Sequence, residues 1–446
     1  MNSANSLDNW IPHSTSELIA ERKLSIGDGY RAKNSELSTE GLPFARAGNI
    51  DGGFQFDDAD RFPEEDLAKV GDKVSQPGDV VFTSKGTVGR LAFVRPTTPR
   101  FVYAPQLCYW RSLDPAVIDN RWLYYWMRGS EFTQQISGVK GQTDMADHVS
   151  LTDQRRMEIT LPPASIQRSI AAVLGSLDDK IEQNRRTARA LERLARAIFR
   201  AWFVDFEPVK AKAEGATSFP SMPQEVFDAL PTRFVDSDIG PVPEGWEVKA
   251  VSEVVDVNPT RSLRKGEPAP YLDMKSMPTK GHAPDSWTER PFGSGMRFMN
   301  GDTLVARITP CLENGKTAFV DFLDDGQIAW GSTEYIVLCP KPPVPPIFAY
   351  CLARTGEFRD FAIQNMTGTS GRQRVSPSAM EHFRLAIPSK EVAEGFGKDL
   401  NPMFECIRSG MEESRKLATM RDYLLPTLLS GEVRVGDIRY EAEIDA

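Results

Sequence analysis

Apolar residues recur at alternating spacings of four and three along residues 165–203. A heptad pattern of this length predicts a long α-helix whose apolar stripe packs against another helix. At 1.5 Å per residue the helix would be a rod of roughly 55–60 Å, which suits a spacer better than a globular domain. The predicted seam of this helix consists of Ile170, Leu174, Leu177, Ile181, Leu191 and Ile198.

A second heptad stripe begins 226 residues later, since Ile170 corresponds to Phe396 (396 − 170 = 226). The same offset matches Tyr124 with Tyr350 in the sequence before each helix. An offset that holds from a globular stretch into a helix predicts one module used twice. The second helix is predicted from Phe396 to about Leu425, with a seam of Leu400, Met403, Ile407, Leu417 and Leu424.

The two stripes predict an antiparallel pair of helices, because the stretch between them brings the chain back. In such a pair Asn184 faces Gly410 or a neighbouring residue, where a single polar group can fix the register. The alternative is that each helix packs only on its own globular unit.

Outside the helices, short β-branched runs alternate with glycine-rich turns, which predicts an α+β fold. The first unit contains a predicted helix at 121–135, ending before Ser137 and Gly138, and a last strand at 159–161. A further short helix is predicted near 224–230. The predicted boundaries are a first globular domain at 1–163, a helix at 164–206, a connector at 207–242, a second globular domain at 243–389, a helix at 390–431 and a tail at 432–446.

The chain has 446 residues, of which 40% are hydrophobic and 26% charged, enough for two or three packed domains. It contains no run of about 18 apolar residues, and its start lacks the pattern of a secretory signal. Its five cysteines include no Cys-x-x-Cys pair, and its four histidines show no metal spacing. We therefore expect a cytoplasmic chain with no membrane association, no disulfide framework and no metal site.

Two motif fragments fail as catalytic signatures, and a third motif is absent. Gly315-Lys316-Thr317 resembles the end of a phosphate-binding loop, but Pro310 stands where the first glycine belongs. Asn258-Pro259-Thr260 lacks the second proline and the aromatic residue of adenine methyltransferases. The sequence also contains no Gly-x-Ser-x-Gly elbow. The chain is therefore predicted to recognise a partner and not to catalyse a reaction.

Taken in order, four features resemble the specificity subunit of a type I restriction–modification system. Each is weak alone, but the ordered set covers nearly the whole chain. The features are the Gly-Asp-apolar strands at 76–81 and 301–305, the Pro-Pro junction at 162–163, the helix exit FRAWFVDF at 199–206, and the segments PEGW at 243–246 and LLPTLLSG at 424–431.

This resemblance implies two target recognition domains in a pseudo-two-fold repeat, separated by two long antiparallel coiled-coil helices. Each domain is expected to read one half of a bipartite double-stranded DNA target. The helices are expected to set the spacer and to dock adenine methyltransferase subunits, two in number, together with a motor–nuclease restriction subunit. The chain itself is expected to catalyse nothing and to bind no cofactor, with S-adenosylmethionine, ATP and Mg on the partner subunits.

Base edges are read by hydrogen bonds, so polar loops are the candidate DNA contacts. Glycine-flanked hairpins between apolar strands supply candidates in both units, and the donor-rich loop at 367–374 is the strongest. Each loop could instead be an ordinary solvated turn. The candidates are Lys85, Thr87, Arg90, Gln142 and Thr143 in the first unit, and Arg307, Asn314, Lys316, Thr369, Ser370, Arg372, Gln373 and Arg374 in the second.

The first helix carries a basic face that includes Arg185, Arg186, Arg189, Arg193, Arg196 and Arg200. It is either a solvated flank, with Glu182 and Glu192 as ion-pair partners, or a surface that follows the spacer DNA. Leu194, Phe199 and Phe203 are apolar residues outside the seam, and they suit the docking of a methyltransferase subunit.

The net charge of −9 is the main objection to DNA binding. A partner that supplies the phosphate contacts would remove the objection, since base contacts carry the specificity. The competing hypothesis is a coiled-coil scaffold that joins two protein-binding domains.

Overall fold

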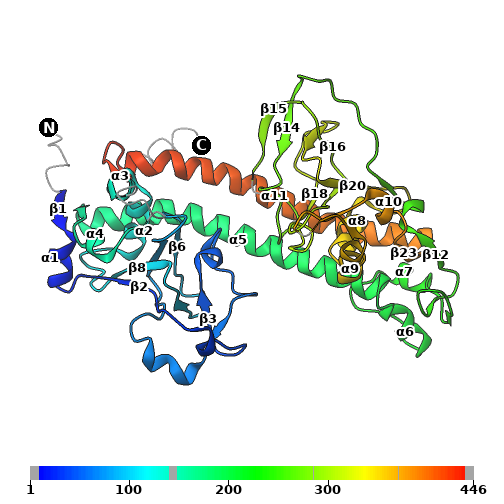
Figure 1. The fold of residues 1–446 in the computed structure, drawn as a ribbon, viewed down its shortest axis with the longest axis horizontal. Coiled ribbons are helices and arrows are strands. Elements are labelled where there is room, and N and C mark those ends of the chain that lie inside the picture. The colour runs from blue at the N-terminus through cyan, green and yellow to red at the C-terminus, as the bar shows by residue number, and fades with distance from the viewer. Residues whose placement is uncertain (1–9, 140–147, 285, 370, 437–446) are drawn as a thin grey trace. The chain divides into compact units, whose positions relative to one another are not determined.

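The fold is given by a computed structural model that describes residues 10–139, 148–284, 286–369 and 371–436 (Figure 1). The chain divides into two compact units. Unit 1 comprises Met1–Ile181 and Arg415–Ala446, and unit 2 comprises Glu182–Ser414. Both unit borders fall inside long helices, α5 (Ala164–Phe203) and α11 (Lys390–Leu429). Each unit therefore contains one globular α+β part and a stretch of both helices.

Unit 1 is built around a four-stranded sheet of order β2-β8-β5-β6, with a separate antiparallel pair of β1 and β9. Short 3₁₀ helices lie at Asn34–Glu36, Ala47–Ile50 and Glu64–Lys69. The remaining elements before α5 are β1 (Ile11–Ser14), α1 (Thr15–Ala20), β2 (Leu24–Asp28), β3 (Leu42–Ala45), β4 (Arg61–Phe62), β5 (Val80–Thr83), β6 (Leu91–Phe93), β7 (Val102–Tyr103), β8 (Leu107–Ser112), α2 (Asn120–Arg128), α3 (Ser130–Val139), α4 (Leu151–Arg155) and β9 (Glu158–Leu161).

The single helix predicted at 121–135 is wrong, because two helices occupy this stretch. Asp119 caps α2 by accepting hydrogen bonds from the backbone N–H groups of Arg121 and Trp122. Gly129 ends α2, and α3 then continues past the predicted breaker at Ser137 to Val139. The Ser137 hydroxyl donates to the Thr133 carbonyl oxygen at 2.8 Å within α3, and the last turn of the helix is anchored by the buried Ile136.

Unit 2 contains a four-stranded sheet of order β13-β20-β17-β18, a second one of order β15-β14-β19-β16, and an antiparallel pair of β12 and β23. A 3₁₀ helix lies at Val251–Glu253. The elements between α5 and α11 are α6 (Glu207–Ala213), α7 (Gln224–Asp228), β10 (Phe234–Val235), β11 (Val242–Pro243), β12 (Glu247–Ala250), β13 (Val255–Val257), β14 (Pro268–Leu272), β15 (Thr288–Pro291), β16 (Met296–Phe298), β17 (Thr303–Ala306), β18 (Thr317–Phe319), β19 (Ala329–Gly331), β20 (Tyr335–Pro340), α8 (Pro346–Ala353), α9 (Gly356–Gln364), β21 (Met366–Thr367), β22 (Arg374–Val375), α10 (Pro377–Met380) and β23 (Arg384–Ile387).

The two units repeat one topology. The sheet order β2-β8-β5-β6 recurs as β13-β20-β17-β18, and the pair β1-β9 recurs as β12-β23. Element starts keep the offset found in the sequence, from β9 to β23 (384 − 158 = 226) and from α5 to α11 (390 − 164 = 226). The prediction of one module used twice is confirmed.

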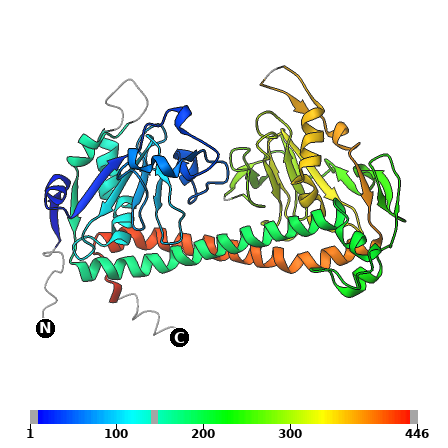
Figure 2. The same ribbon diagram turned by 90° about the horizontal axis from the view of Figure 1, so that it is seen from below.

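The long helices pair with each other in both units, and they run side by side in both ribbon views (Figure 2). In unit 1, Ile170 and Leu174 of α5 share a core with Leu425 of α11. In unit 2, Ile198 of α5 shares a core with Leu400 of α11. The start of α5 thus packs on the end of α11, and the end of α5 packs on the start of α11. The predicted antiparallel pairing is confirmed. Every predicted seam residue is buried or half-buried.

Asn184 makes the polar contact of the seam that was predicted from the sequence. Its amide nitrogen donates to the Gly410 carbonyl oxygen at 3.1 Å and to the Ser414 hydroxyl at 3.2 Å. Asn184 and Gly410 are also 226 positions apart (410 − 184 = 226), so a residue of one helix contacts its own counterpart in the other. This contact fixes the register of the antiparallel pair.

α11 begins at Lys390, six residues before the predicted Phe396 (396 − 390 = 6). Glycines at 395 and 397 weaken the helical signal there. A Cβ on Gly395 would stand 2.4 Å from a methyl group of Val226, so this glycine serves close packing of α7 on the helix. Within the described ranges, no helix is both long and apolar enough to cross a lipid bilayer.

Candidate nucleic-acid interface

In unit 2 the two candidate segments, the β17–β18 hairpin and the loop at 367–374, lie against each other. The backbone N–H of Thr309 donates to the Gln373 carbonyl oxygen at 3.0 Å, and that of Val375 donates to the Arg307 carbonyl oxygen at 3.0 Å. An antiparallel bridge joins Ile308 to Arg374. The candidate residues Arg307 and Gln373 therefore lie on two backbone segments that pair directly with each other.

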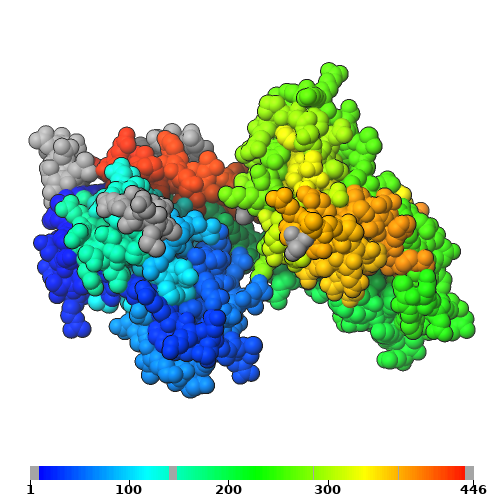
Figure 3. Space-filling view, viewed as in Figure 1, coloured from blue at the N-terminus to red at the C-terminus, as the bar shows by residue number. Residues whose placement is uncertain are grey.

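Strands β21 and β22 carry the loop and place its tip in solvent. Arg372 and Thr369 are exposed, and the N–H of Arg372 donates to the Thr369 carbonyl oxygen at 3.0 Å. The turn needs Gly368 and Gly371, whose φ angles of 123° and 77° suit glycine. The segment from α9 through β22 forms the gold-to-orange surface in Figure 3. The candidate Ser370 lies outside the described residues.

Two of the predicted contacts in unit 2 are held by the protein itself. The Arg374 guanidinium forms a forked pair with Glu334, with Nε–O distances of 2.9 and 3.0 Å, and this hydrogen bonding raises the pKa of Arg374. The Lys316 ammonium donates to the Met274 carbonyl oxygen at 2.6 Å. Both side chains therefore stabilise the loops that they belong to, whereas Asn314 is exposed.

Unit 1 repeats this arrangement. Lys85, on the β5–β6 hairpin, forms an antiparallel bridge with His148, the counterpart of Arg374 (374 − 148 = 226). The N–H of Val149 also donates to the Ser84 carbonyl oxygen at 3.0 Å. Burial and then the nearby Lys85 charge lower the pKa of His148. In both units, therefore, a hairpin contacts a segment that follows a helix. The hairpin is β5–β6 and the helix α3 in unit 1, and they are β17–β18 and α9 in unit 2.

The other candidates in unit 1 differ from one another in exposure and in partners. Thr87 is exposed at the hairpin tip. Arg90 forms an ion pair with Asp51 at 3.0 Å, and both side chains are largely solvated. Gln142 and Thr143 lie outside the described residues.

The Gly-Asp motifs have a structural role that the sequence did not reveal. The buried Asp79 carboxylate accepts from the Arg111 guanidinium at 2.6 and 2.8 Å and from the Tyr103 hydroxyl at 2.6 Å. It also accepts from the backbone N–H of Gln76 at 2.8 Å. Asp302 in unit 2 likewise pairs with Arg261 and accepts from the Met299 N–H at 2.8 Å. The motif therefore locks the turn that leads into the central strand.

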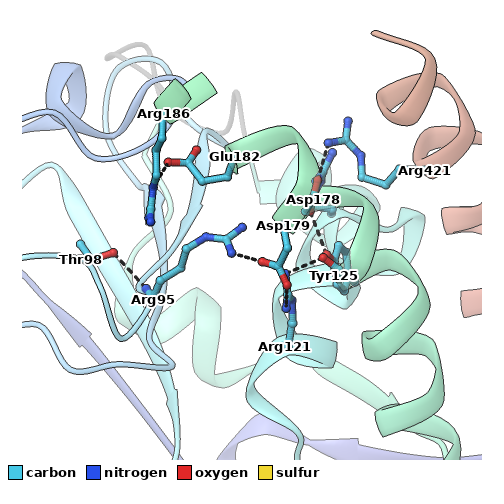
Figure 4. Close-up of polar contacts among 11 residues, drawn as sticks. Arg95, Thr98, Arg121, Tyr125, Asp178, Asp179, Glu182, Arg186 and Arg421 are labelled. Carbon is cyan, nitrogen blue, oxygen red and sulfur yellow. Dashed lines mark hydrogen bonds and ion pairs between the residues drawn. The ribbon is translucent and has the colours of Figure 1, made fainter. Parts of the chain in front are cut away.

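A polar network in unit 1 fixes the globular part on the helices (Figure 4). Asp178 of α5 accepts from the Tyr125 hydroxyl of α2 at 2.8 Å and from Arg421 of α11 at 2.7 Å. The neighbouring Asp179 accepts from both terminal nitrogens of Arg121 at 2.7 Å, and this bonding lowers its pKa. Sequence reasoning missed these residues, because their partners come from three separate segments.

The basic face of α5 has ion-pair partners at three positions. Arg186 pairs with Glu182 at 3.0 Å, Arg196 lies 3.9 Å from Glu192, and Arg200 pairs with Asp205 at 3.0 Å. These contacts favour the interpretation of a solvated helix flank.

The prediction that Phe199 and Phe203 dock a partner is wrong. Their exposed fractions are 1% and 7%, and both rings pack on Phe348 of α8 and Phe396 of α11. Leu194, by contrast, is 45% exposed. A heptad pattern cannot separate these residues, since the globular part covers a second face of the helix.

Residues 26–193 match the family described as the type I restriction modification DNA specificity domain. The chain is 22% identical to the type I restriction enzyme HindI specificity subunit of Haemophilus influenzae over 83% of its own length and 89% of the relative's. It is 24% identical to the MjaIX specificity subunit of Methanocaldococcus jannaschii over 82% of this chain and 80% of the relative. The resemblance to type I specificity subunits is confirmed.

The fold of a solved type I specificity subunit matches nearly the whole chain. The crystal structure of the S subunit from M. genitalium superimposes with a TM-score of 0.54 and 15% identity, covering 96% of this chain and 97% of that one. The family match ends at residue 193, inside α5, so the second copy of the module is recognised through the relatives and the internal repeat.

Proposed function

We propose that this chain is the non-catalytic DNA-specificity subunit of a type I restriction–modification complex, and that each unit reads one half of a bipartite target. One observation carries the proposal. In each unit a hairpin pairs with the segment that follows the second helix of the globular part, which is α3 in unit 1 and α9 in unit 2. This pairing joins Lys85 to His148 in unit 1 and Ile308 to Arg374 in unit 2. A reader built twice suits a target that comes in two parts.

The polar loops suit base recognition better than general DNA binding. Arg372 and Thr369 offer exposed donors on a short hairpin, which is the type of group that reads base edges in a groove. The net charge of −9 means that other subunits supply most of the phosphate contacts. Specificity and affinity are then divided between this chain and its partners.

Partner docking is supported by exposed apolar residues at equivalent positions on the two helices. Leu194 of α5 is 45% exposed and Met420 of α11 is 53% exposed, and they are 226 positions apart (420 − 194 = 226). Large exposed apolar side chains at matching places suit two copies of one partner. We assign these surfaces to two adenine methyltransferase subunits in the cytoplasm, with a motor–nuclease subunit completing the complex. S-adenosylmethionine, ATP and Mg belong to those partners.

The test is to purify the chain with its co-encoded methyltransferase and to select bound sequences from randomised duplexes. We expect two defined half-sites separated by a spacer of undefined sequence. Selection of one continuous sequence would overturn the two-reader proposal. A complex without salt-dependent DNA affinity would instead support the scaffold hypothesis, which the acidic net charge favours.

A further inference from the structure

Unit 2 contains a cavity of about 100 Å³ that is lined by three arginines, Arg196 of α5, Arg354 at the end of α8 and Arg359 of α9. The hairpin residues Gly315 and Thr317 and the exposed Thr279 form part of the remaining wall. A volume of roughly 10–15 Å³ is enough for one water molecule, so this cavity can hold a small polyatomic ion.

The equivalent position in unit 1 provides a comparison, because there the arginine has carboxylate partners. In unit 1, Arg128 lies 3.5 Å from Asp178 and 3.4 Å from Asp422. The counterparts in unit 2 are Arg354 for Arg128 (354 − 128 = 226), Phe404 for Asp178 (404 − 178 = 226) and Arg196 for Asp422 (422 − 196 = 226). Unit 2 therefore keeps the arginine, loses both carboxylates and gains a second arginine.

Arg354 holds the same local position as Arg128. Arg128 lies over the Tyr124 ring at 5.5 Å, and Arg354 lies over the Tyr350 ring at 5.4 Å. Arg354 donates to the carbonyl oxygens of Thr279, Gly315 and Thr317 at 2.8, 2.9 and 2.8 Å, and also to that of Gly281 and to the Tyr350 hydroxyl. Its charge is thus fixed at the cavity wall by neutral acceptors.

The other two arginines retain donors for a ligand. Arg196 donates to the Arg354 carbonyl oxygen at 3.4 Å and lies 3.9 Å from Glu192, whose carboxylate already accepts from Tyr350 at 2.6 Å. Within the described ranges, the Arg359 guanidinium makes no hydrogen bond or ion pair, and it lies over Gly315. Three guanidinium groups face one carboxylate, which leaves a local charge of +2 (3 − 1 = 2).

We infer that this cavity binds a phosphate group. A phosphate group carries one negative charge in a DNA backbone and up to two as the free ion, so the local positive charge attracts either form. Guanidinium groups bind phosphate oxygens with forked, charge-assisted hydrogen bonds. Arg196 and Arg359 donate to the ion, while Arg354 contributes charge and shape. The site is separate from the paired loops of the proposed DNA reader, although its wall includes the hairpin at Gly315.

The first experiment measures the melting temperature of the full chain in inorganic phosphate, against chloride at equal ionic strength. We expect phosphate to raise it by a few degrees, because a ligand that binds the folded state stabilises it. Arg359→Ala and Arg196→Gln should each abolish this rise. Arg233→Ala, which removes an equally charged side chain that is 75% exposed and paired with Glu244, should retain it. An equal rise in all four proteins would overturn the site.

The second experiment identifies the source of the phosphate. If a DNA backbone phosphate occupies the cavity, Arg359→Ala should reduce the slope of log affinity against log salt by about 0.9 in the assembled complex. An unchanged slope, together with the phosphate effect on melting, assigns the site to free phosphate. If phosphate raises the melting temperature of wild type and Arg359→Ala equally, the inference is refuted, whatever the salt slope. The melting experiment needs no DNA, so it is independent of the proposed function.

Discussion

The aspartate of each Gly-Asp pair shows how one residue can carry a family resemblance for a structural reason. Asp79 is fully buried, and its carboxylate joins Arg111 of β8, Tyr103 of β7 and the turn before β5. Burial, followed by the Asp79 charge, raises the pKa of the Tyr103 hydroxyl, so this residue stays a neutral donor. The motif holds three strands together and is not a DNA contact.

Asp79→Asn should destabilise unit 1 by about 3 kcal/mol, because it leaves the Arg111 guanidinium buried without its counter-charge. The measurement is the denaturant midpoint followed by the fluorescence of the buried Trp110, Trp122 and Trp126. Asp114→Asn is the matched control, since its pair with Lys23 is about one-third exposed on both sides, and it should shift the midpoint far less. Equal shifts would show that the buried pair contributes no more to the free energy of unfolding than the partly exposed pair.

Arg372→Ala should relax selection at one half-site by about 1–3 kcal/mol of discrimination, while the complex still assembles. Arg372 is exposed at the loop tip, so its loss leaves the fold intact. Selection from randomised duplexes by the assembled complex provides the measurement, with Arg233→Ala as the control. Unchanged preference at both half-sites would remove Arg372 from the reader.

The loop could be identified from the sequence, but which of its side chains are held by the protein and which are exposed could not. Two glycines, at 368 and 371, and a run of donors after them identify 367–374 as a polar loop. The roles of Arg374 and Lys316 depend on partners 40 and 42 positions away (374 − 334 = 40, 316 − 274 = 42). No local pattern encodes such a pair, so a single sequence cannot tell an anchored arginine from an available one.

At the scale of elements, the paired helices were the most predictable part of the fold. Heptad spacing is local and periodic, so it identified the seam of α5 and the contact of Asn184 with Gly410. The order of strands in the sheets was not predictable, because pairs such as β2 with β8 join segments that are far apart in the chain. The break at Gly129 was missed for a related reason, since packing decides where α2 stops and α3 begins.

Gly410 tests the register of the seam. A Cβ at this position would stand 3.6 Å from the Asn184 Cβ, an ordinary contact, so Gly410→Ala should raise stability by about 0.5–1 kcal/mol through helix propensity. Gly410→Leu should instead cost about 1–3 kcal/mol relative to alanine, because the larger side chain overpacks the seam and displaces the Asn184 amide.

Thermal unfolding of the full chain measures both Gly410 variants. Ser409→Leu is the control, since the neighbouring residue is exposed and its replacement adds similar bulk outside the seam. A Gly410→Leu protein as stable as the Ser409→Leu protein would show that the two helices do not need this close contact.

At the scale of the whole molecule, the repeat gives one chain two similar but unequal units. The sheet that contains β5 and β6 recurs with the same strand order, whereas the three-stranded sheet β4-β3-β7 of unit 1 corresponds to the larger sheet β15-β14-β19-β16 of unit 2. Both of these sheets contain a parallel pair, β3 with β7 and β14 with β19. The shared part carries the paired loops, and the second sheet is where the two units differ most in structure.

The same repeat predicts how partners assemble. Leu194 and Met420 occupy equivalent helix positions, so each should contribute to one docking surface for one methyltransferase subunit. Leu194→Glu and Met420→Glu should each remove one copy from the co-expressed complex, and the double variant should remove both, because a buried unpaired carboxylate is costly at an apolar contact. Native mass spectrometry counts the copies directly.

Leu113→Glu is the control, since Leu113 is 48% exposed on the globular part of unit 1 and should leave two copies bound. If the double variant still carried two copies, the docking surfaces would lie elsewhere on the chain. If either single variant lost both, the two copies would bind as one preassembled pair and not through independent, repeated sites.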